Sequence, residues 1–399
     1  MKLQIDNNLF KKALVQLERY VWERDYSGYD PYDALNSNIF GKCNNKWIRL
    51  AATQLFLRSP ISFRTIFKTP KGKNPKGIGI FLHAYCKLYE MSLFDKSNLL
   101  NISEKLANWL IENSSHEYSG YCWGYNFPWQ SYNNFLKKGE PTVVNTSFIS
   151  NAILDLYDKT KNNEYLKIAR SSCDFILKGL NITERPEGIC FSYTPFDENL
   201  CHNANLLGAE LLSRVYSITR EEALLEYAKK AFDFTLYHQN PDGSWDYSID
   251  PQTGKGRKQI DFHQGFVLDS IFSFIKYTKP SDDKYMKSLL KGAEFYKNEQ
   301  FLEEGRCKYR WPRVYPIGIH HQAQGIITFS KLSEIKTEYL EFAKKIALWT
   351  IKNMQDPSGY FYYRKYRFFT NKIPYMRWGQ AWMMLALASL LEAMENGRK

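Results

Sequence analysis

Five short polar segments of this 399-residue chain hold the side chains best suited to chemistry. Acid–base chemistry needs two groups on either side of a reacting bond, and carboxylates and imidazoles often fill this role. We therefore predict Asp261 and Asp246 as catalytic carboxylates, with His263 either orienting Asp261 or acting itself. The residues leave open which group is the acid and which the base. The five segments are Asn145-Thr146-Ser147, Cys201-His202-Asn203-Ala204-Asn205, Asp261-Phe262-His263-Gln264, His320-His321-Gln322 and Tyr375-Met376-Arg377-Trp378-Gly379-Gln380.

Aromatic and polar residues around these segments are suited to binding a sugar. Flat rings stack on the apolar faces of sugars, while amide, imidazole and guanidinium groups bind hydroxyls or acidic groups. Arg377 is the best candidate for pairing with a carboxylated or phosphorylated substrate. Two other roles stay open, namely helix capping for the polar residues and core packing for the rings. The predicted substrate-binding residues are Trp123, Tyr125, Trp129, Asn145, His202, Asn205, Trp245, Tyr309, Trp311, Arg313, His320, His321, Arg377, Trp378 and Gln380.

Cysteine usage bears on both metal binding and location. Cys201 and His202, with Cys122 or Cys190, could form a Cys/Cys/His zinc site. Their spacing has no local zinc signature, so small buried thiols are the alternative, and we predict no metal and no cofactor. The seven cysteines are scattered without a CxxC pair, which is typical of reduced thiols in a cytoplasmic protein.

A repeat organises the elements that must position these residues. A glycine beside aromatic residues recurs at positions 28, 120, 188, 243, 305 and 359, so that successive glycines lie 92, 68, 55, 62 and 54 residues apart. An amphipathic segment with one polar face precedes each glycine, and a more apolar segment follows it. The amphipathic helices are predicted near 7–24, 98–114, 162–178, 221–238, 283–301 and 337–354. The apolar helices are predicted near 75–91, 143–158, 202–217, 262–277, 318–333 and 377–394.

Six polar-faced helices alternating with six apolar ones predict an all-α fold, an (α/α)6 barrel or toroid of six helical hairpins. The apolar helices form its inner layer. Each glycine-aromatic loop joins an outer helix to an inner one, so all six loops gather at one end with the inner N-termini, which favour anionic groups. We predict one domain over 1–399, with an insertion at about 34–74 that contains a basic loop and is a candidate cap over the expected cleft.

The formal net charge of +12 admits several partners. Nucleic acid, an anionic membrane surface and an acidic polymer are all candidates, and a lysine-rich solubilising surface is the alternative. No nucleic-acid-binding motif accompanies the charge, so we predict no nucleic-acid partner. The N-terminus has no apolar signal core, and the longest apolar run, 382–391, is far shorter than the ~20 residues that span a bilayer. We predict no transmembrane segment.

Several motifs resemble known toroidal families. Gln239-Asn240-Pro241-Asp242-Gly243-Ser244-Trp245 resembles the QW repeat of terpene cyclases, which marks an α/α barrel, although the acidic DxDD motif of those enzymes is absent. Arg377-Trp378-Gly379-Gln380-Ala381-Trp382 is similar to the RGQAW stretch of unsaturated glucuronyl hydrolases, with one Trp inserted. That resemblance implies a six-hairpin barrel with acidic catalytic residues at its mouth, and Asp261 is the best positional match.

Two further resemblances concern the inner helices. Asn203-Ala204-Asn205 and the run from Asp261 to Phe266 look like a bacterial and archaeal group of barrel proteins found with polysaccharide-biosynthesis genes. Cys122-Trp123-Gly124 and Cys201-His202 are similar to the WCxG and CHG motifs of lanthionine-synthetase cyclases, but the first is reversed and Asn203 replaces the Gly. That second resemblance implies a zinc-dependent peptide cyclase.

Three functional hypotheses follow. The first is a carbohydrate-active protein of polysaccharide metabolism that acts on an acidic oligo- or polysaccharide by hydrolysis, elimination or epimerisation. The second is a non-catalytic glycan-binding or assembly protein of a polysaccharide pathway. The third is the zinc-dependent cyclase.

Overall fold

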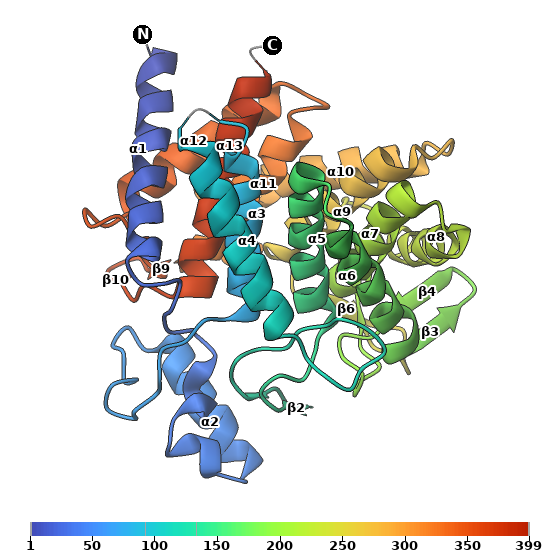
Figure 1. The fold of residues 1–399 in the computed structure, drawn as a ribbon, viewed down its shortest axis with the longest axis horizontal. Helices are drawn as coiled ribbons and strands as arrows, with labels where there is room; N and C mark the ends of the chain where they lie inside the picture. The colour runs from blue at the N-terminus through green and yellow to red at the C-terminus, as the bar shows by residue number, and fades with distance from the viewer. Residues whose placement is uncertain (1, 92, 133, 398–399) are drawn as a thin grey trace.

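Two layers of helices form the barrel in the computed structural model, which describes residues 2–91, 93–132 and 134–397 (Figure 1). Each inner helix packs against the next, and the last packs against the first, which closes the ring. The predicted (α/α)6 fold is confirmed. The inner helices are α3 (Pro75–Leu88), α5 (Val143–Thr160), α7 (His202–Thr219), α9 (His263–Thr278), α11 (Ile319–Leu332) and α13 (Trp382–Asn396), the last preceded by a π-helical segment, Met376–Ala381. The outer helices are α1 (Lys2–Trp22), α4 (Lys96–Glu112), α6 (Asn163–Asp174), α8 (Glu222–Tyr237), α10 (Lys284–Gln300) and α12 (Glu338–Met354).

The two layers differ because their side-chain patterns differ. Residues 202–215 of α7 are all buried, as expected for a helix enclosed on every side. In α8, by contrast, buried residues such as Ala228 and Ala231 alternate with exposed Lys229 and Lys230. The apolar face of each outer helix therefore packs onto the inner ring, and its charged face meets water.

The loop glycines join neighbouring hairpins. A Cβ on Gly243, whose φ is +98°, would lie 2.5 Å from the carbonyl oxygen of Lys291 in the next outer helix. Gln239 donates to the carbonyls of Gly243 and Ser288, both at 3.0 Å, and thereby ties the loop to that helix. The same contact between loop glycine and next outer-helix backbone recurs at Gly120, Gly188, Gly305 and Gly359.

Polar side chains at the starts of the inner helices hold the same loops from the other side. Gln264 accepts a hydrogen bond from the Trp245 amide and donates to the Trp245 carbonyl, at 2.9 and 2.7 Å. Gln380 binds the amide and carbonyl of Phe361 in the same way, at 2.8 and 2.9 Å. Each loop backbone is therefore fixed between its own inner helix and the next outer helix.

Short antiparallel strands lie in the loops at this end of the barrel. Two of the sheets join loops that follow different outer helices, because β5 pairs with β6 and β8 pairs with β9. The strands are β1 (Trp129–Gln130), β2 (Phe135–Leu136), β3 (Ile182–Arg185), β4 (Gly188–Phe191), β5 (Leu200–Cys201), β6 (Ser248–Ile249), β7 (Gly256–Arg257), β8 (Ile317–Gly318), β9 (Arg364–Lys365) and β10 (Thr370–Asn371).

The predicted insertion projects beyond the barrel at the loop end, where it carries helix α2 (Lys46–Arg58) (Figure 1). Ala34, Ala52 and Phe56 form a small core of its own. Arg64 anchors it, because its Nε lies 2.7 Å from Asp33 and its Nη1 donates to the Tyr375 hydroxyl at 2.9 Å. The organisation of the whole chain as a single domain stays a prediction.

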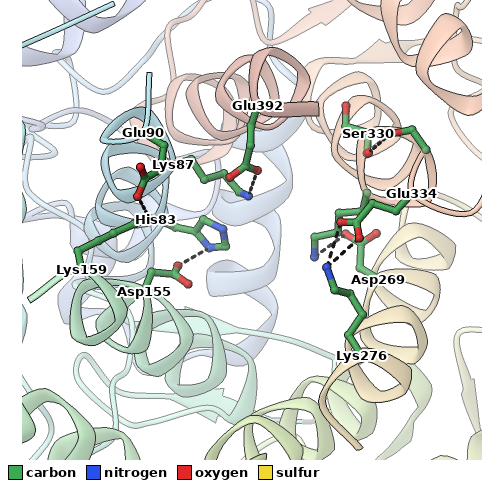
Figure 2. A network of polar contacts seen from close by, with 12 residues as sticks. His83, Lys87, Glu90, Asp155, Lys159, Asp269, Lys276, Ser330, Glu334 and Glu392 are labelled. Atoms are coloured by element: carbon green, nitrogen blue, oxygen red, sulfur yellow. Dashed lines mark hydrogen bonds and ion pairs between the residues drawn. The ribbon is translucent and has the colours of Figure 1, made fainter. Parts of the chain in front are cut away.

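The opposite end of the barrel is lined by paired charges (Figure 2). Lys87 Nζ lies 2.5 Å from Glu392, and Lys276 Nζ lies 2.8 Å from Glu334. A cavity of about 910 Å³ opens there. Because so many of its charges neutralise one another, this end is less suited to catalysis than the loop end. No helix in the described residues is long and apolar enough to cross a membrane.

Candidate active site

A cavity of about 440 Å³ lies at the loop end of the barrel. Its walls come from the starts of inner helices and from the loops that join outer helices to inner ones, as the repeat predicted. Among the described residues, nine that the sequence singled out line it, namely Tyr125, Trp129, Asp261, His263, Tyr309, His320, His321, Arg377 and Trp378.

Asp261 and His263 form a hydrogen-bonded pair on the cavity wall. His263 Nδ1 lies 2.5 Å from Asp261 Oδ1, and the His263 amide donates to the same oxygen at 3.1 Å. Gln259 donates to Oδ2 at 2.9 Å. Burial would raise the pKa of Asp261, but the positive charges that His263 and His321 carry when protonated, together with the hydrogen bonds of His263, lower it to about 2. An ionised Asp261 holds the proton on Nδ1, which leaves His263 Nε2 as the proton acceptor.

Two more imidazoles belong to the same wall. The Phe262 ring lies 4.1, 4.3 and 4.7 Å from the rings of His263, His320 and His321. Burial lowers the pKa of His321 to about 4 and that of His320 well below its ordinary value. Both side chains are therefore neutral at pH 7. His321 Nε2 lies 2.9 Å from the Tyr309 carbonyl, which fixes the proton on Nε2.

Arg377 is held in place by a carboxylate. Its Nε and Nη2 donate to the two oxygens of Asp30 at 2.6 and 2.8 Å, and both side chains are buried. Lys76, at the start of α3, also lines the cavity, and its Nζ lies 4.6 Å from the centre of the Phe148 ring. No carboxylate lies within salt-bridge distance of Lys76 among the described residues. Burial, followed by the charge of Arg377, lowers the pKa of Lys76 well below its ordinary value.

Aromatic rings form one rim of the cavity. Tyr32 lies edge-on to Trp129 and Trp378, with ring centres 6.4 and 5.4 Å apart. Tyr125 stacks on Phe127 at 5.4 Å. Such rings offer flat apolar surface next to the charged groups of the wall.

Several predicted substrate-binding residues lie outside this lining. The rings of Trp123 and Trp245 are fully buried, and their indole N–H groups donate to the carbonyls of Leu110 and Thr235. They are plugs beneath the loops, the alternative considered for them. The side-chain amides of Asn205 and Gln380 form hydrogen bonds with the loop backbone, and both side chains are fully buried.

The remaining predicted residues are placed as follows. Asn145 and His202 are buried side chains with no hydrogen-bond partner among the described residues. Trp311 donates to Glu299, and Arg313 is exposed. Asp246 is half-buried against Gly256 and is not among the lining residues that the structure describes.

Sequence reasoning missed several lining residues. Lys76 falls within the helix predicted near 75–91 but is absent from the predicted site, although it begins an inner helix as His263 does. Tyr32 follows the first loop glycine, Gly28, so the glycine-aromatic repeat could have identified it as a cavity residue. Arg257 ends the short strand β7 and Arg310 lies in a loop, and no sequence pattern fixes the path of either segment. The lining residues outside our prediction include Tyr32, Lys76, Tyr193, Arg257, Gln259 and Arg310.

The described residues contain no group of three or more His, Cys, Asp or Glu side chains arranged to hold a metal ion. Cys122 and Cys201 are buried, and burial raises the pKa of their thiols to about 12 and 11. Cys201 Sγ donates to Asn203 at 3.1 Å. The predicted alternative of a zinc site built on these thiols therefore finds no assembled ligand set in this part of the chain.

The architecture is shared with solved carbohydrate-active enzymes. The cellobiose 2-epimerase of Bacillus thermoamylovorans matches with a TM-score of 0.64 at 16% identity, over 81% of this chain and 88% of that one. An unsaturated glucuronyl hydrolase specific for heparin matches with a TM-score of 0.64 at 15% identity, over 99% and 98%. The chain has the six-hairpin, glycosidase-like (α/α)6 fold.

A GH76 α-mannanase from Bacteroides thetaiotaomicron has the same fold, with a TM-score of 0.63 at 14% identity over 82% of this chain and 88% of that one. No protein-family model and no curated protein matches the chain. At these identities the six-hairpin likeness establishes the fold, and the reaction has to be argued from the site.

Proposed function

We propose that this six-hairpin protein is an enzyme of polysaccharide metabolism that transfers a proton to or from an acidic sugar in the loop-end cavity. The observation that carries the proposal is the Asp261–His263 pair on the cavity wall. Asp261 orients the imidazole and stabilises its protonated form, and His263 Nε2 takes up the proton.

The cavity favours an anionic substrate. Its lining includes five basic side chains but only two carboxylates, Asp197 and Asp261, among the described residues. Asp197 accepts hydrogen bonds from the Thr194 amide and the Asn199 amide, and so maintains a turn. A carboxylated sugar would supply the missing negative charge, while the rings of Trp129 and Trp378 contact its apolar faces. The basic residues are Lys76, Arg257, Arg310, Arg364 and Arg377.

The arrangement favours chemistry at carbon over two-carboxylate hydrolysis. A hydrolase of that kind places two carboxyl groups ~5–9.5 Å apart across the bond, and Asp197 is already engaged in its turn. A base beside neutral imidazoles suits removal of the proton next to a carbonyl or carboxylate group. Return of a proton to the opposite face gives epimerisation. Expulsion of the β-oxygen, which leaves with a proton, gives elimination.

Deuterium incorporation tests this proposal directly. Oligosaccharides ending in a uronic acid are incubated with the protein in D₂O, and the products are followed by NMR and mass spectrometry. Epimerisation places deuterium at the reacting carbon, and elimination gives an unsaturated product. His263→Gln should abolish either signal, and Asp261→Asn should lower kcat by about 10²–10⁴. Glu226→Gln, an exposed change on α8, is the control.

Two outcomes would contradict the proposal. Saturable binding of the glycan without any product would favour the non-catalytic binding protein. The predicted pairing of Asp246 with Asp261 is tested by Asp246→Asn, which we expect to retain turnover because Asp246 is outside the described lining. Loss of hydrolysis in that variant, with ¹⁸O entering the product from labelled water, would restore the two-carboxylate mechanism.

A further inference from the structure

The insertion at 34–74 exposes several large apolar side chains. Helix α2 buries Ala52 and Phe56 in the small core of the insertion. Trp47, Ala51 and Leu55 recur every four residues on another face of the helix and are exposed, Trp47 by 63% and Leu55 by 45%. An exposed apolar face on a short helix is typical of a surface that binds a membrane or another protein.

The charge of the insertion is entirely of one sign. Residues 34–74 contain eight basic residues and no Asp or Glu. Arg64 and Lys73 are paired with Asp33 and Asp25, which lie outside the segment. The other basic residues of the segment are available to bind an anionic partner. The eight basic residues are Lys42, Lys46, Arg49, Arg58, Arg64, Lys68, Lys71 and Lys73.

This surface continues to the rim of the cavity. The Trp47 ring lies 6.2 Å from the ring of Tyr132, and Lys46 Nζ lies 4.7 Å above that ring. Tyr132 lines the cavity. The insertion also contacts the loop that carries β10, because Asn371 of β10 donates to the Ser59 carbonyl at 2.9 Å. Phe368, in the turn before β10, adds another exposed ring, with 88% of its surface accessible.

We propose that residues 34–74 bind the surface of an anionic lipid bilayer, with α2 lying in the headgroup region. Tryptophan and aliphatic side chains enter that region, while lysine and arginine bind the lipid phosphates. This role goes beyond the proposed reaction and does not depend on it. A second copy of the chain would bring the same positive surface, so self-association through this face is opposed by repulsion. A nucleic acid would neutralise the charge but leave the apolar side chains Trp47, Ile61 and Ile66 in water.

Vesicle co-sedimentation tests the membrane surface. We expect the full chain to sediment with vesicles of equimolar phosphatidylcholine and phosphatidylglycerol but not with vesicles of phosphatidylcholine alone. Binding to the anionic vesicles should weaken as the salt concentration rises. Trp47→Ser with Leu55→Ser should weaken binding at least about tenfold, since two apolar side chains no longer leave water. The triple change Lys42→Gln, Lys46→Gln and Arg58→Gln should weaken it at least about tenfold and reduce its salt dependence.

Matched control variants distinguish binding through this surface from non-specific binding to vesicles. Tyr237→Ser removes an exposed ring elsewhere, and Lys105→Gln with Lys229→Gln and Lys345→Gln removes three exposed charges from outer helices. Both should bind vesicles as the unchanged protein does, and circular dichroism verifies that every variant is folded. Equal vesicle binding by the Trp47/Leu55 variant, binding of RNA in place of vesicles, or a dimer that depends on Trp47 would each overturn the proposal.

Discussion

Arg377 and Asp30 are 347 positions apart in the chain, yet two hydrogen bonds of 2.6 and 2.8 Å join the guanidinium to the carboxylate at the cavity wall. Asp30 follows the first outer helix, and Arg377 begins the last inner segment. The pair therefore joins the first and last hairpins of the ring and also sets the direction of a cationic group in the site.

Removing one member of this pair should destabilise the protein. Asp30→Asn leaves Arg377 buried without its counter-ion, and we expect the free energy of unfolding to fall by about 3–5 kcal/mol. Chemical denaturation measures the change. The double variant with Arg377→Met should lose less than the sum of the two single variants, because neither charge is then left alone. Additive losses would mean that the two groups stabilise the ring independently.

Lys76 should act on substrate affinity more than on turnover. Its ammonium group faces the cavity without a salt-bridge partner in the described residues, so Lys76→Met should raise the KM for a carboxylated oligosaccharide about tenfold or more. The variant should also be at least as stable as the original, because a buried cation has been removed. Steady-state kinetics with the acid and its methyl ester separate the effects. An equal KM change for both substrates would contradict a charge interaction.

Gly243 should tolerate no side chain. Gly243→Ala places a Cβ 2.5 Å from the Lys291 carbonyl at a φ of +98°, and we expect a loss of about 2–5 kcal/mol in the free energy of unfolding. Gly254 offers a matched control, because its φ is +68° and nothing lies within 4 Å of the added atom. Gly254→Ala should cost about 1 kcal/mol. Equal losses would show that strain at positive φ, and not the contact with α10, decides the cost.

Buried imidazoles should make the fold sensitive to acid. Burial, with the charge of His238, lowers the pKa of His202 to about 3, from an ordinary 6.5. Below pH 6.5 the unfolded chain binds this proton and the folded chain does not, so stability falls as the pH falls towards 3. His202→Phe should flatten the slope by about 1.4 kcal/mol per pH unit. Denaturation at pH 7, 6, 5 and 4 measures it, and His116→Gln, a change at an exposed histidine, is the control.

The helices could be predicted from the sequence because each shows a clear period of polar and apolar residues. The polar residues that begin the inner helices were harder to assign. Asp261 and Gln264 are three residues apart on one helix start, yet Asp261 lines the cavity and Gln264 clamps the Trp245 backbone. Both are buried polar residues at a helix end, and only the direction of each side chain separates the two roles.

Long-range pairs lay beyond any local pattern. The Asp30–Arg377 and Asp33–Arg64 ion pairs depend on how the insertion packs on the ring. Lys76 became a site residue only when α3 was placed beside α13, which brings it close to the Trp382 ring. Sequence spacing therefore located the end of the barrel where chemistry is expected, but it could not select the side chains that face the cavity.

The loop contacts also bear on circular permutation. Gln355 donates to the carbonyls of Gly359 and of Ala13 in α1, both at 3.0 Å, which repeats between the last and first hairpins the contact that Gln239 makes between consecutive ones. The helices that carry the two chain ends, α1 and α13, reach the same end of the barrel (Figure 1). A permutant that links these ends and opens the chain between Thr160 and Asn163 would keep all of these contacts. We therefore expect it to close the same ring, whichever hairpin is synthesised first.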